Sequence, residues 1–310
     1  MIITPSSLDS TFVGFNTRFQ QGFNSVQPMA SVLAMDVPSS GDSNVYAWLG
    51  KLLRMREWIG PRQLQNISAR SYTLQNKLFE MSLAVPRAKI ADDQLGTFGP
   101  LFQEMGAQTA LWMDDLLVKA LQRGNTSDAL GWDGKNFFAT DHPIDLDGRV
   151  SGTNANILTA ATINETTVDA ARVAMANFKG EDGRPLGTKM THILVPPALE
   201  LAARKVVQAE YLASGATNVL NQAAQIIVLP QLSDTTNDAA SLSTWYALDL
   251  SRVIKPLVSQ VREAPDFVSR TDPASDPKFN RDEYEFGSQA RGAAGYGVYF
   301  CAIRNSTAGT

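Results

Sequence analysis

The sequence has few of the side chains that most often carry catalysis and metal binding. Its 310 residues include one cysteine, Cys301, and two histidines, His142 and His192. A single cysteine excludes an intramolecular disulfide. The apolar run GVYFCAI around it predicts a buried thiol rather than a nucleophile, which would need an exposed position beside a base. The three residues have no local metal-ligand spacing, so no metal site is predicted.

Charged side chains are also scarce, and they are evenly spread. They make up 19% of the chain, and 27 Lys and Arg against 31 Asp and Glu give a net charge of −4. Without a concentrated basic face, any contact with nucleic acid is expected to be nonspecific. No apolar stretch approaches the roughly 20 residues of a membrane span, and the opening MIITPSSLDSTF does not resemble a signal peptide. We therefore expect a protein made in a reducing cytoplasm, with no membrane partner.

The motifs of common active sites are missing as well. The sequence holds neither a Gly-X-Ser-X-Gly nucleophile elbow nor a Gly-X4-Gly-Lys-Ser/Thr phosphate loop. The glycine-rich stretch 287–297 fits no dinucleotide pattern and predicts close packing between strands. Residues 145–148, DLDG, resemble the start of a calcium loop, but the remaining ligands and the closing glutamate are absent. No catalytic, cofactor-binding or metal residue is therefore predicted.

The adjacent pair Asp141-His142, within DGKNFFATDHPI, is the remaining candidate for chemistry. Adjacent residues of an extended chain point to opposite sides, so Asp141 is poorly placed to orient the imidazole as in a catalytic triad. Pro143 favours an extended or turn conformation at His142. We interpret His142 as a loop histidine whose ring nitrogens bond to backbone groups. A hydrolase that uses His142 with Asp141 or a serine is a remote alternative.

The first third of the chain predicts an arm and a hairpin. Four phenylalanines at helical spacing predict a helix that Asp9 or Ser10 caps, followed by an extended arm with apolar residues; they are Phe12, Phe15, Phe19 and Phe23. Two strands with a polar stretch between them are expected within residues 46–92. An isolated hairpin is marginally stable in water, so this one is expected to pack against a neighbouring part of the structure.

A long helix is predicted over residues 96–123. Gly99 is expected at its cap with Pro100 just inside, and Gly124 ends it. Its apolar stripe is Phe98, Phe102, Met105, Thr109, Trp112 and Leu116.

The remainder predicts an α/β module followed by a β-rich return. Asn164 is expected to cap one helix, and strands at 190–195 and 226–230 flank a second, which places His192 half-buried in a strand. Four strands are expected between residues 244 and 304, with residues 264–282 as a long polar loop.

This order of elements resembles the phage Hong Kong 97 capsid fold, whose parts are named the N-arm, E-loop, spine helix, A-domain and P-domain. Two segments, LFQEMG (101–106) and DGKNFFATDHP (133–143), and the opening MIIT with its following Leu and Phe residues are similar to the phage Mu major head protein family. The resemblance covers nearly the whole chain and implies an α+β fold of this type. It implies an N-terminal arm at 1–45, an E-loop hairpin at 46–92, a P-domain at 93–156 and 241–310 with spine helix 96–123, and an A-domain at 157–240.

The resemblance also implies a function. It implies the major capsid protein of a tailed bacteriophage or prophage, whose copies form the hexamers and pentamers of an icosahedral shell around double-stranded DNA. Implied partners are a scaffolding protein or protease, a portal at one vertex, DNA through nonspecific contacts, and a decoration protein as a further candidate. The implied location is the virion, with the host cytoplasm during assembly. An encapsulin-like compartment shell and a tail tube protein stay as alternatives.

The prototype of the fold differs in two respects. It carries a cleaved N-terminal scaffolding segment and links its subunits covalently through Lys and Asn. No long helical extension is expected before Phe12, so a separate scaffolding protein is predicted. Covalent cross-links are not expected, although Lys77 on the hairpin leaves that option open.

Overall fold

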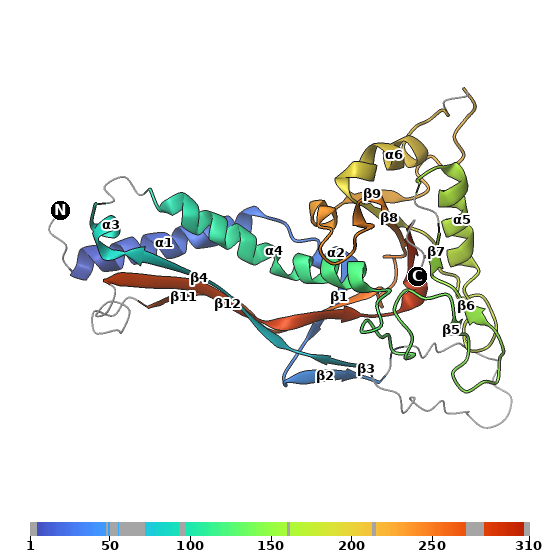
Figure 1. Ribbon diagram of the computed structural model, residues 1–310, viewed down its shortest axis with the longest axis horizontal. Coiled ribbons are helices and arrows are strands. Elements are labelled where there is room, and N and C mark those ends of the chain that lie inside the picture. Colours follow the sequence, from blue (N-terminus) through green and yellow to red (C-terminus); the bar gives the residue numbers. More distant parts are fainter. Residues whose placement is uncertain are drawn as a thin grey trace.

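The structure is a computed structural model that describes residues 5–47, 49, 55, 72–92, 97–159, 162–212, 215–270 and 282–306, without the side chains of 5–10 and 91–92. It has a slender part, in which long helices lie along a long sheet, and a wider body at one end (Figure 1). The described chain begins at the far end of the slender part and ends in the body. The described helices include none that is long and apolar enough to cross a membrane.

A four-stranded sheet runs the length of the slender part, in the order β1-β11-β12-β4. The strand β1 (Ala34–Pro38) lies parallel to β11 (Leu257–Arg270), while β12 (Glu283–Tyr296) and β4 (Lys77–Pro86) continue the sheet antiparallel. The expectation of a loop over 264–282 is wrong for its first part, because residues 264–270 belong to β11. The alternating segment 79–85, expected in the hairpin, pairs with β12 in this sheet.

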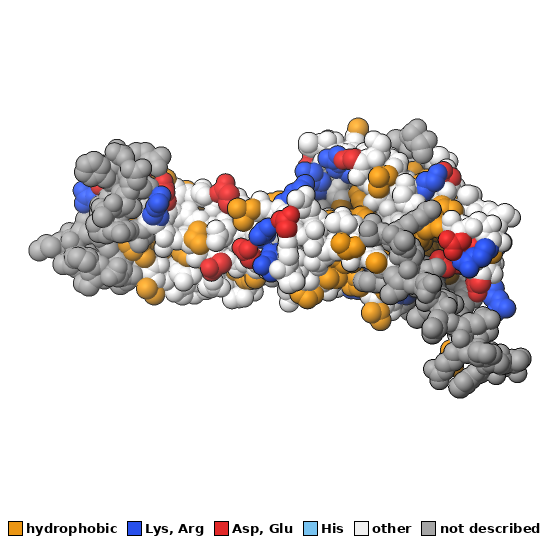
Figure 2. Space-filling view, turned by 90° about the horizontal axis from the view of Figure 1, so that it is seen from below, with side chains coloured by type: hydrophobic (Ala, Val, Ile, Leu, Met, Phe, Trp, Pro, Cys, Tyr) orange, Lys and Arg blue, Asp and Glu red, His pale blue; other side chains and the backbone are white. Residues whose placement is uncertain are grey.

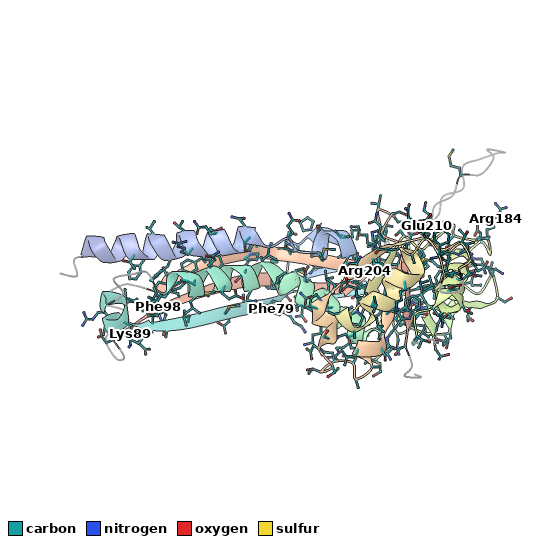
Figure 3. The ribbon with its side chains drawn as sticks, turned by 90° about the horizontal axis from the view of Figure 1, so that it is seen from above. Phe79, Lys89, Phe98, Arg184, Arg204 and Glu210 are labelled. Atoms are coloured by element: carbon teal, nitrogen blue, oxygen red, sulfur yellow. The ribbon has the colours of Figure 1, made fainter. Side chains whose placement is uncertain are left out.

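Two long helices, α1 (Pro5–Ser25) and α4 (Gly99–Arg123), cover one face of this sheet. Figure 3 shows them side by side, with Phe98 at the start of α4 and Phe79 on the sheet below. Aromatic rings fill the space between helices and sheet: Phe15 stacks on Phe102 at a centroid distance of 4.2 Å, and Phe102 meets Phe286 edge-on at 5.0 Å. These geometries are the ones that aromatic pairs prefer.

The two helices touch at glycines. A Cβ atom added to Gly22 would lie 1.7 Å from the carbonyl oxygen of Gln103, and one added to Gly106 would lie 2.0 Å from that of Phe19. Only the missing side chains therefore allow the backbones to approach this closely. Because α1 already begins at Pro5, the expected cap at Asp9 or Ser10 is wrong, and the chain is helical well before Phe12.

The long helix α4 begins three residues later than predicted and buries a different stripe in its second half. Phe98 is the N-cap, Pro100 lies in the first turn, and Gly124 follows the last residue. Trp112 and Leu116, expected in the buried stripe, are only partly buried. The fully buried line continues instead through Met113, Leu117 and Leu121. The second half of the helix therefore turns its apolar face toward the wide body.

The body contains a five-stranded sheet in the order β7-β13-β10-β8-β9. Its strands are β7 (Ile157–Leu158), β8 (His192–Val195), β9 (Gln225–Val228), β10 (Trp245–Leu248) and β13 (Ala302–Asn305). The helices α5 (Glu165–Ala176) and α6 (Pro197–Val207) accompany it. Asn164 caps α5 as predicted, in a reciprocal capping box with Thr167. Since β10 and β13 come from beyond residue 240, the expected division at 240/241 cuts through this sheet.

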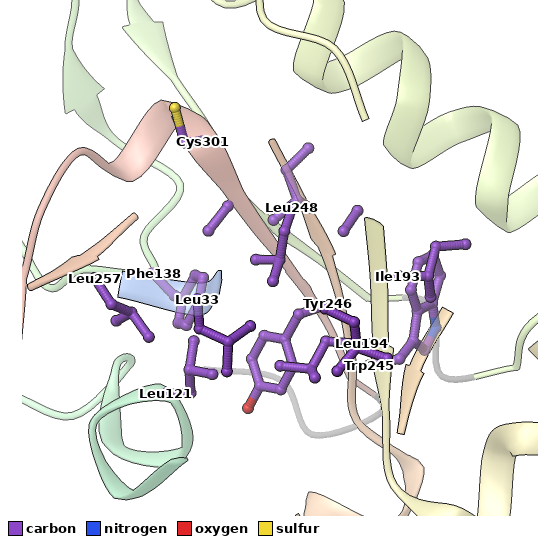
Figure 4. Close-up of a cluster of buried hydrophobic side chains, with 14 of the residues drawn as sticks. Leu33, Leu121, Phe138, Ile193, Leu194, Trp245, Tyr246, Leu248, Leu257 and Cys301 are labelled. Atoms are coloured by element: carbon purple, nitrogen blue, oxygen red, sulfur yellow. The ribbon is translucent and has the colours of Figure 1, made fainter. Parts of the chain in front are cut away.

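The main core lies between this sheet and the end of α4. Every residue of β10 and β13 is buried, as is usual for strands covered on both faces. Figure 4 shows Tyr246 of β10 among Leu33, Leu121 and Leu194, and Trp245 on the other face of the strand beside Ile193. The remaining elements are short: α2 (Ala30–Leu33), β2 (Ser43–Tyr46), β3 (Tyr72–Gln75), α3 (Arg87–Asp92), β5 (His142–Pro143), β6 (Thr153–Asn154), and the 3-10 turns Pro230–Ser233, Ser241–Ser243 and Tyr299–Cys301.

Candidate functional site: a sealed histidine cluster and two projecting segments

His142 lies in the two-residue strand β5, which pairs with β6. Its side chain is fully buried and stacks flat on Tyr299, with ring centroids 3.8 Å apart and planes 5° apart. The turn at residues 131–135 brings Asp133 back toward it, and Gly134 adopts a positive φ of 77° there. The sequence segment that suggested an Asp-His pair therefore does form one, but with a different aspartate.

The hydrogen bonds of this cluster fix its proton arrangement. Asn156 donates through Nδ2 to the carbonyl oxygens of Phe137 and Tyr299, and its Oδ1 accepts from the backbone N–H of Ala139. The amide oxygen therefore faces Nε2 of His142, 3.1 Å away, and Nε2 must donate. A carboxylate oxygen of Asp133 lies 2.6 Å from Nδ1, so a second hydrogen is shared between these two groups.

The prediction that the ring nitrogens of His142 bond to backbone groups is wrong, because both bond to side chains. Asp141 points the other way, as expected, and pairs with Lys135 at the surface. The hydrogen bond from Lys135 lowers the pKa of Asp141. The side chains of His142 and Asp133 are 0% and 1% exposed. The arrangement joins three segments of chain and gives a substrate no access to the imidazole.

The other candidates for chemistry lie apart from one another. His192 is half-buried at the start of β8, as predicted, and its Nδ1 bonds to the hydroxyl of Thr191. Cys301 is buried, and burial raises the pKa of its thiol to about 12. In the calcium-like stretch, Asp145 turns its oxygens onto the backbone N–H of Asp147 and Arg149. Within the described residues, no group of three or more His, Cys, Asp or Glu is placed to hold a metal ion.

The N-terminal arm is held by a pair of opposite charges that the sequence analysis did not identify. Asp114 of α4 accepts the backbone N–H of Met29 at 2.8 Å, at the start of the one-turn helix α2, and Lys255 donates to the carbonyl oxygens of Ser31 and Val32 at its end. Burial raises the pKa of Asp114, and backbone hydrogen bonds oppose part of that shift. The sequence signal for this contact was a carboxylate, Asp114, among the residues that α4 buries.

The second projecting segment is the hairpin of β2 and β3, which pair from Ser43 with Gln75 to Tyr46 with Tyr72. It forms a sheet of its own beside the four-stranded sheet (Figure 1). Residues 46–92 were expected to hold this hairpin, but its first strand begins at Ser43 and its return ends at Gln75. Between β2 and β3 the structure describes residues 47, 49 and 55; residues 48, 50–54 and 56–71 lie outside it.

Comparison with protein families gives a match along the chain. The model of the Mu-like prophage major head subunit gpT family matches residues 8–161, 157–232 and 231–308. The chain belongs to this family. The predicted resemblance to Mu-like head proteins is thereby confirmed, and the compartment shell and tail tube alternatives are not favoured. This family member is the major capsid protein of a Mu-like phage.

Individual relatives agree with this assignment. The major capsid protein of Escherichia phage Mu is 30% identical over 305 residues, which are 98% of this chain and 74% of the relative. The Mu-like prophage FluMu major head subunit of Haemophilus influenzae is 27% identical over 297 residues, 96% of this chain and 72% of the relative. A chain from the procapsid of bacteriophage JBD30 superposes with a TM-score of 0.62 at 28% identity, covering 99% of this chain and 77% of that one. The predicted Hong Kong 97-type capsid fold is confirmed.

Proposed function

We propose that copies of this chain assemble into hexamers and pentamers that close an icosahedral shell around double-stranded DNA. The observation that carries the proposal is the similarity to a procapsid chain over 99% of this chain, together with the family match. A shell subunit needs many contacts of modest strength, because closure of the shell makes each further contact effectively intramolecular. The slender part, the arm and the hairpin give the chain a large surface for such contacts.

We assign the capsid domains by their sheets. The P-domain is the spine helix α4 with the strands β4, β11 and β12, and the A-domain is the five-stranded sheet with α5 and α6. The arm comprises α1, α2 and β1, which adds to the P-domain sheet, and the E-loop is the β2–β3 hairpin. This assignment keeps the predicted order of parts. It moves β10 and β13 into the A-domain and β4 into the P-domain, because each is hydrogen-bonded within that sheet.

The proposed partners are a separate scaffolding protein or protease, a portal at one vertex and packaged DNA, with a decoration protein as a further candidate. The proposed location is the virion, with the host cytoplasm during assembly. A net charge of −4 suits a container for DNA, because a strongly basic inner wall would bind the DNA during packaging. We assign no catalytic role to His142, whose ring is sealed and whose hydrogen bonds serve to join chain segments.

Expression of the chain with the scaffolding protein of its phage tests this proposal. Negative-stain electron microscopy should show closed particles of uniform size, and particles purified after packaging should hold DNA that resists nuclease. A subunit that stays monomeric with and without the scaffolding protein would contradict the proposal. A denaturing gel of the particles should show the monomer alone, whereas a ladder of larger species would contradict the prediction that subunits are not cross-linked.

A further inference from the structure

The orientation of the β2–β3 hairpin depends on contacts beyond the backbone ladder of the main sheet. Its two strands bond to each other and form a sheet of their own, whereas β1, β4, β11 and β12 form the neighbouring sheet. Two strands of four residues are too few to hold a fixed angle to the body by themselves. Side chains at the base of the hairpin must therefore set the angle of β2 and β3 to the neighbouring sheet.

Gln260 of β11 lies under this base and is fully buried. Its Oε1 accepts the hydroxyl of Tyr46, the last residue of β2, at 2.7 Å. Its Nε2 donates to the carbonyl oxygen of Leu74 in β3 at 3.1 Å and to Oδ1 of Asn76 at 2.6 Å. One amide thus holds both strands of the hairpin and the chain that leaves it, and all of its contacts reach residues more than 180 positions away.

The side-chain amide of Asn76 fixes the orientation of the Gln260 amide. Asn76 is buried, and its Nδ2 donates to the hydroxyl of Ser39 at 2.8 Å and to the carbonyl oxygen of Gly41 at 2.9 Å. Its Oδ1 therefore faces Gln260 as an acceptor. A reversed Gln260 would place its oxygen against two acceptors, so a single arrangement satisfies the whole set.

A second contact lies on the neighbouring strand. The hydroxyl of Tyr72, at the start of β3, accepts the backbone N–H of Tyr296 in β12 at 3.0 Å. Gly295 leaves the space for it, since an added Cβ would lie 2.7 Å from that hydroxyl oxygen. Contacts on β11 and β12 therefore restrain the hairpin against two strands of the main sheet.

We propose that Gln260 is a positioning residue for assembly: its amide sets the angle of β2 and β3 to the four-stranded sheet, and this angle fixes how the hairpin strands meet a second copy of this chain in a closed shell. The proposal rests on the proposed function. Loss of the amide leaves the hairpin attached and still held through Tyr72, but less restrained in its angle. The effect therefore falls on the form of the assembled particle more than on the folding of the subunit.

Gln260→Leu tests the proposal, with Gln122→Leu as the matched control. Gln122 is equally buried, and its amide donates to the carbonyl oxygen of Asp234 and the hydroxyl of Ser241, away from the hairpin. Both variants should melt a few degrees below the wild type. In hydrogen–deuterium exchange of unassembled subunits, Gln260→Leu alone should raise exchange at least tenfold in β2 and β3. With the scaffolding protein, it alone should lower the yield of closed shells at least tenfold.

The outcomes separate the inference from the proposed function. Unchanged exchange in β2 and β3, or a wild-type yield of closed shells from Gln260→Leu, would overturn the inference. An equal loss of shells in Gln122→Leu would do the same. Failure of the wild type to form shells would overturn the proposed function, and exchange would still decide whether Gln260 holds the hairpin. If Gln260→Leu does not fold, Tyr46→Phe is the second variant, because it removes only the hydroxyl that donates to Gln260. It should raise exchange in β2 and β3 and lower the yield of closed shells, both by smaller factors.

Discussion

The contact between α1 and α4 predicts a large effect for a substitution that adds one methyl group. In Gly106→Ala the new Cβ would lie 2.0 Å from the carbonyl oxygen of Phe19, whereas ordinary contact begins near 3.4 Å. The two helices must therefore move apart by about 1.4 Å, the difference between these distances, and this loosens the Phe15–Phe102 stack. Overpacking of this kind costs up to about 3 kcal/mol, and the better helix propensity of alanine returns about 1 kcal/mol. We expect a net loss of about 2 kcal/mol.

Gly14→Ala is the matched control, because Gly14 lies exposed on α1, the other helix of the pair, with nothing within 4 Å of its added Cβ. It should raise the free energy of unfolding by about 1 kcal/mol through helix propensity alone. Urea denaturation of the unassembled subunits, followed by circular dichroism, measures both values. If Gly106→Ala unfolds within 0.5 kcal/mol of the wild type, about the spread of substitutions far from special features, then α1 does not pack on α4 as described.

Three further predictions concern buried polar groups. Asp133→Ala leaves Nδ1 of His142 without its partner in a sealed site and should cost about 1–3 kcal/mol, whereas Asp141→Ala removes a surface pair and should cost under about 1 kcal/mol; equal losses in urea denaturation would contradict the account of the cluster. Asp238→Ala leaves the buried guanidinium of Arg304 without its carboxylate and should cost about 3–5 kcal/mol, and adding Arg304→Met should recover part of the loss in the same assay. Burial raises the pKa of Cys301 from 9.0 to about 12, so the contribution of its thiol to stability is complete below pH 9 and is lost as the pH rises toward 12. The loss amounts to at most about 1.4 kcal/mol per pH unit. Cys301→Ala should flatten this decline in the free energy of unfolding between pH 8 and 11, and an unchanged slope would show that other groups cause it.

The sequence predicted helices and strands well where the residues that stabilise an element lie within that element. The helix at α5 follows from Asn164 and the spacing of Val168, Ala171 and Met175, and the structure has these three buried as a stripe. The start of α4 was close because Pro100 marks a first turn. The family resemblance rested on two short segments and is confirmed over the chain.

The sequence could not show which distant strands share a sheet. β10 pairs with β8 on one side and with β13 on the other, each time between residues more than 50 positions apart. Nothing in these apolar runs distinguishes a strand of this sheet from a strand of the four-stranded sheet. The loop prediction failed over residues 264–270 for a similar reason: these residues lie on the exposed end of β11, where pairing with β12 supplies the stability that the local pattern lacks.

The buried polar contacts were missed for a related reason. Gln260 lies in an apolar strand and Asp114 in the apolar stripe of a helix. In the sequence, neither differs from any other single polar residue within a buried element. Their partners, Tyr46 and Met29, lie far away in the chain. The sequence suggested the neighbouring Asp141 as the partner of His142, but the turn at Gly134 places Asp133 beside its ring instead.

Cryo-electron microscopy of particles purified from cells that express this chain with its scaffolding protein tests the central claim most directly. The account predicts closed shells whose capsomers have fivefold and sixfold symmetry, with the long helix α4 and the four-stranded sheet recognisable in every subunit. Stacked rings that form an open tube, or a preparation that contains monomers under every assembly condition, would contradict it.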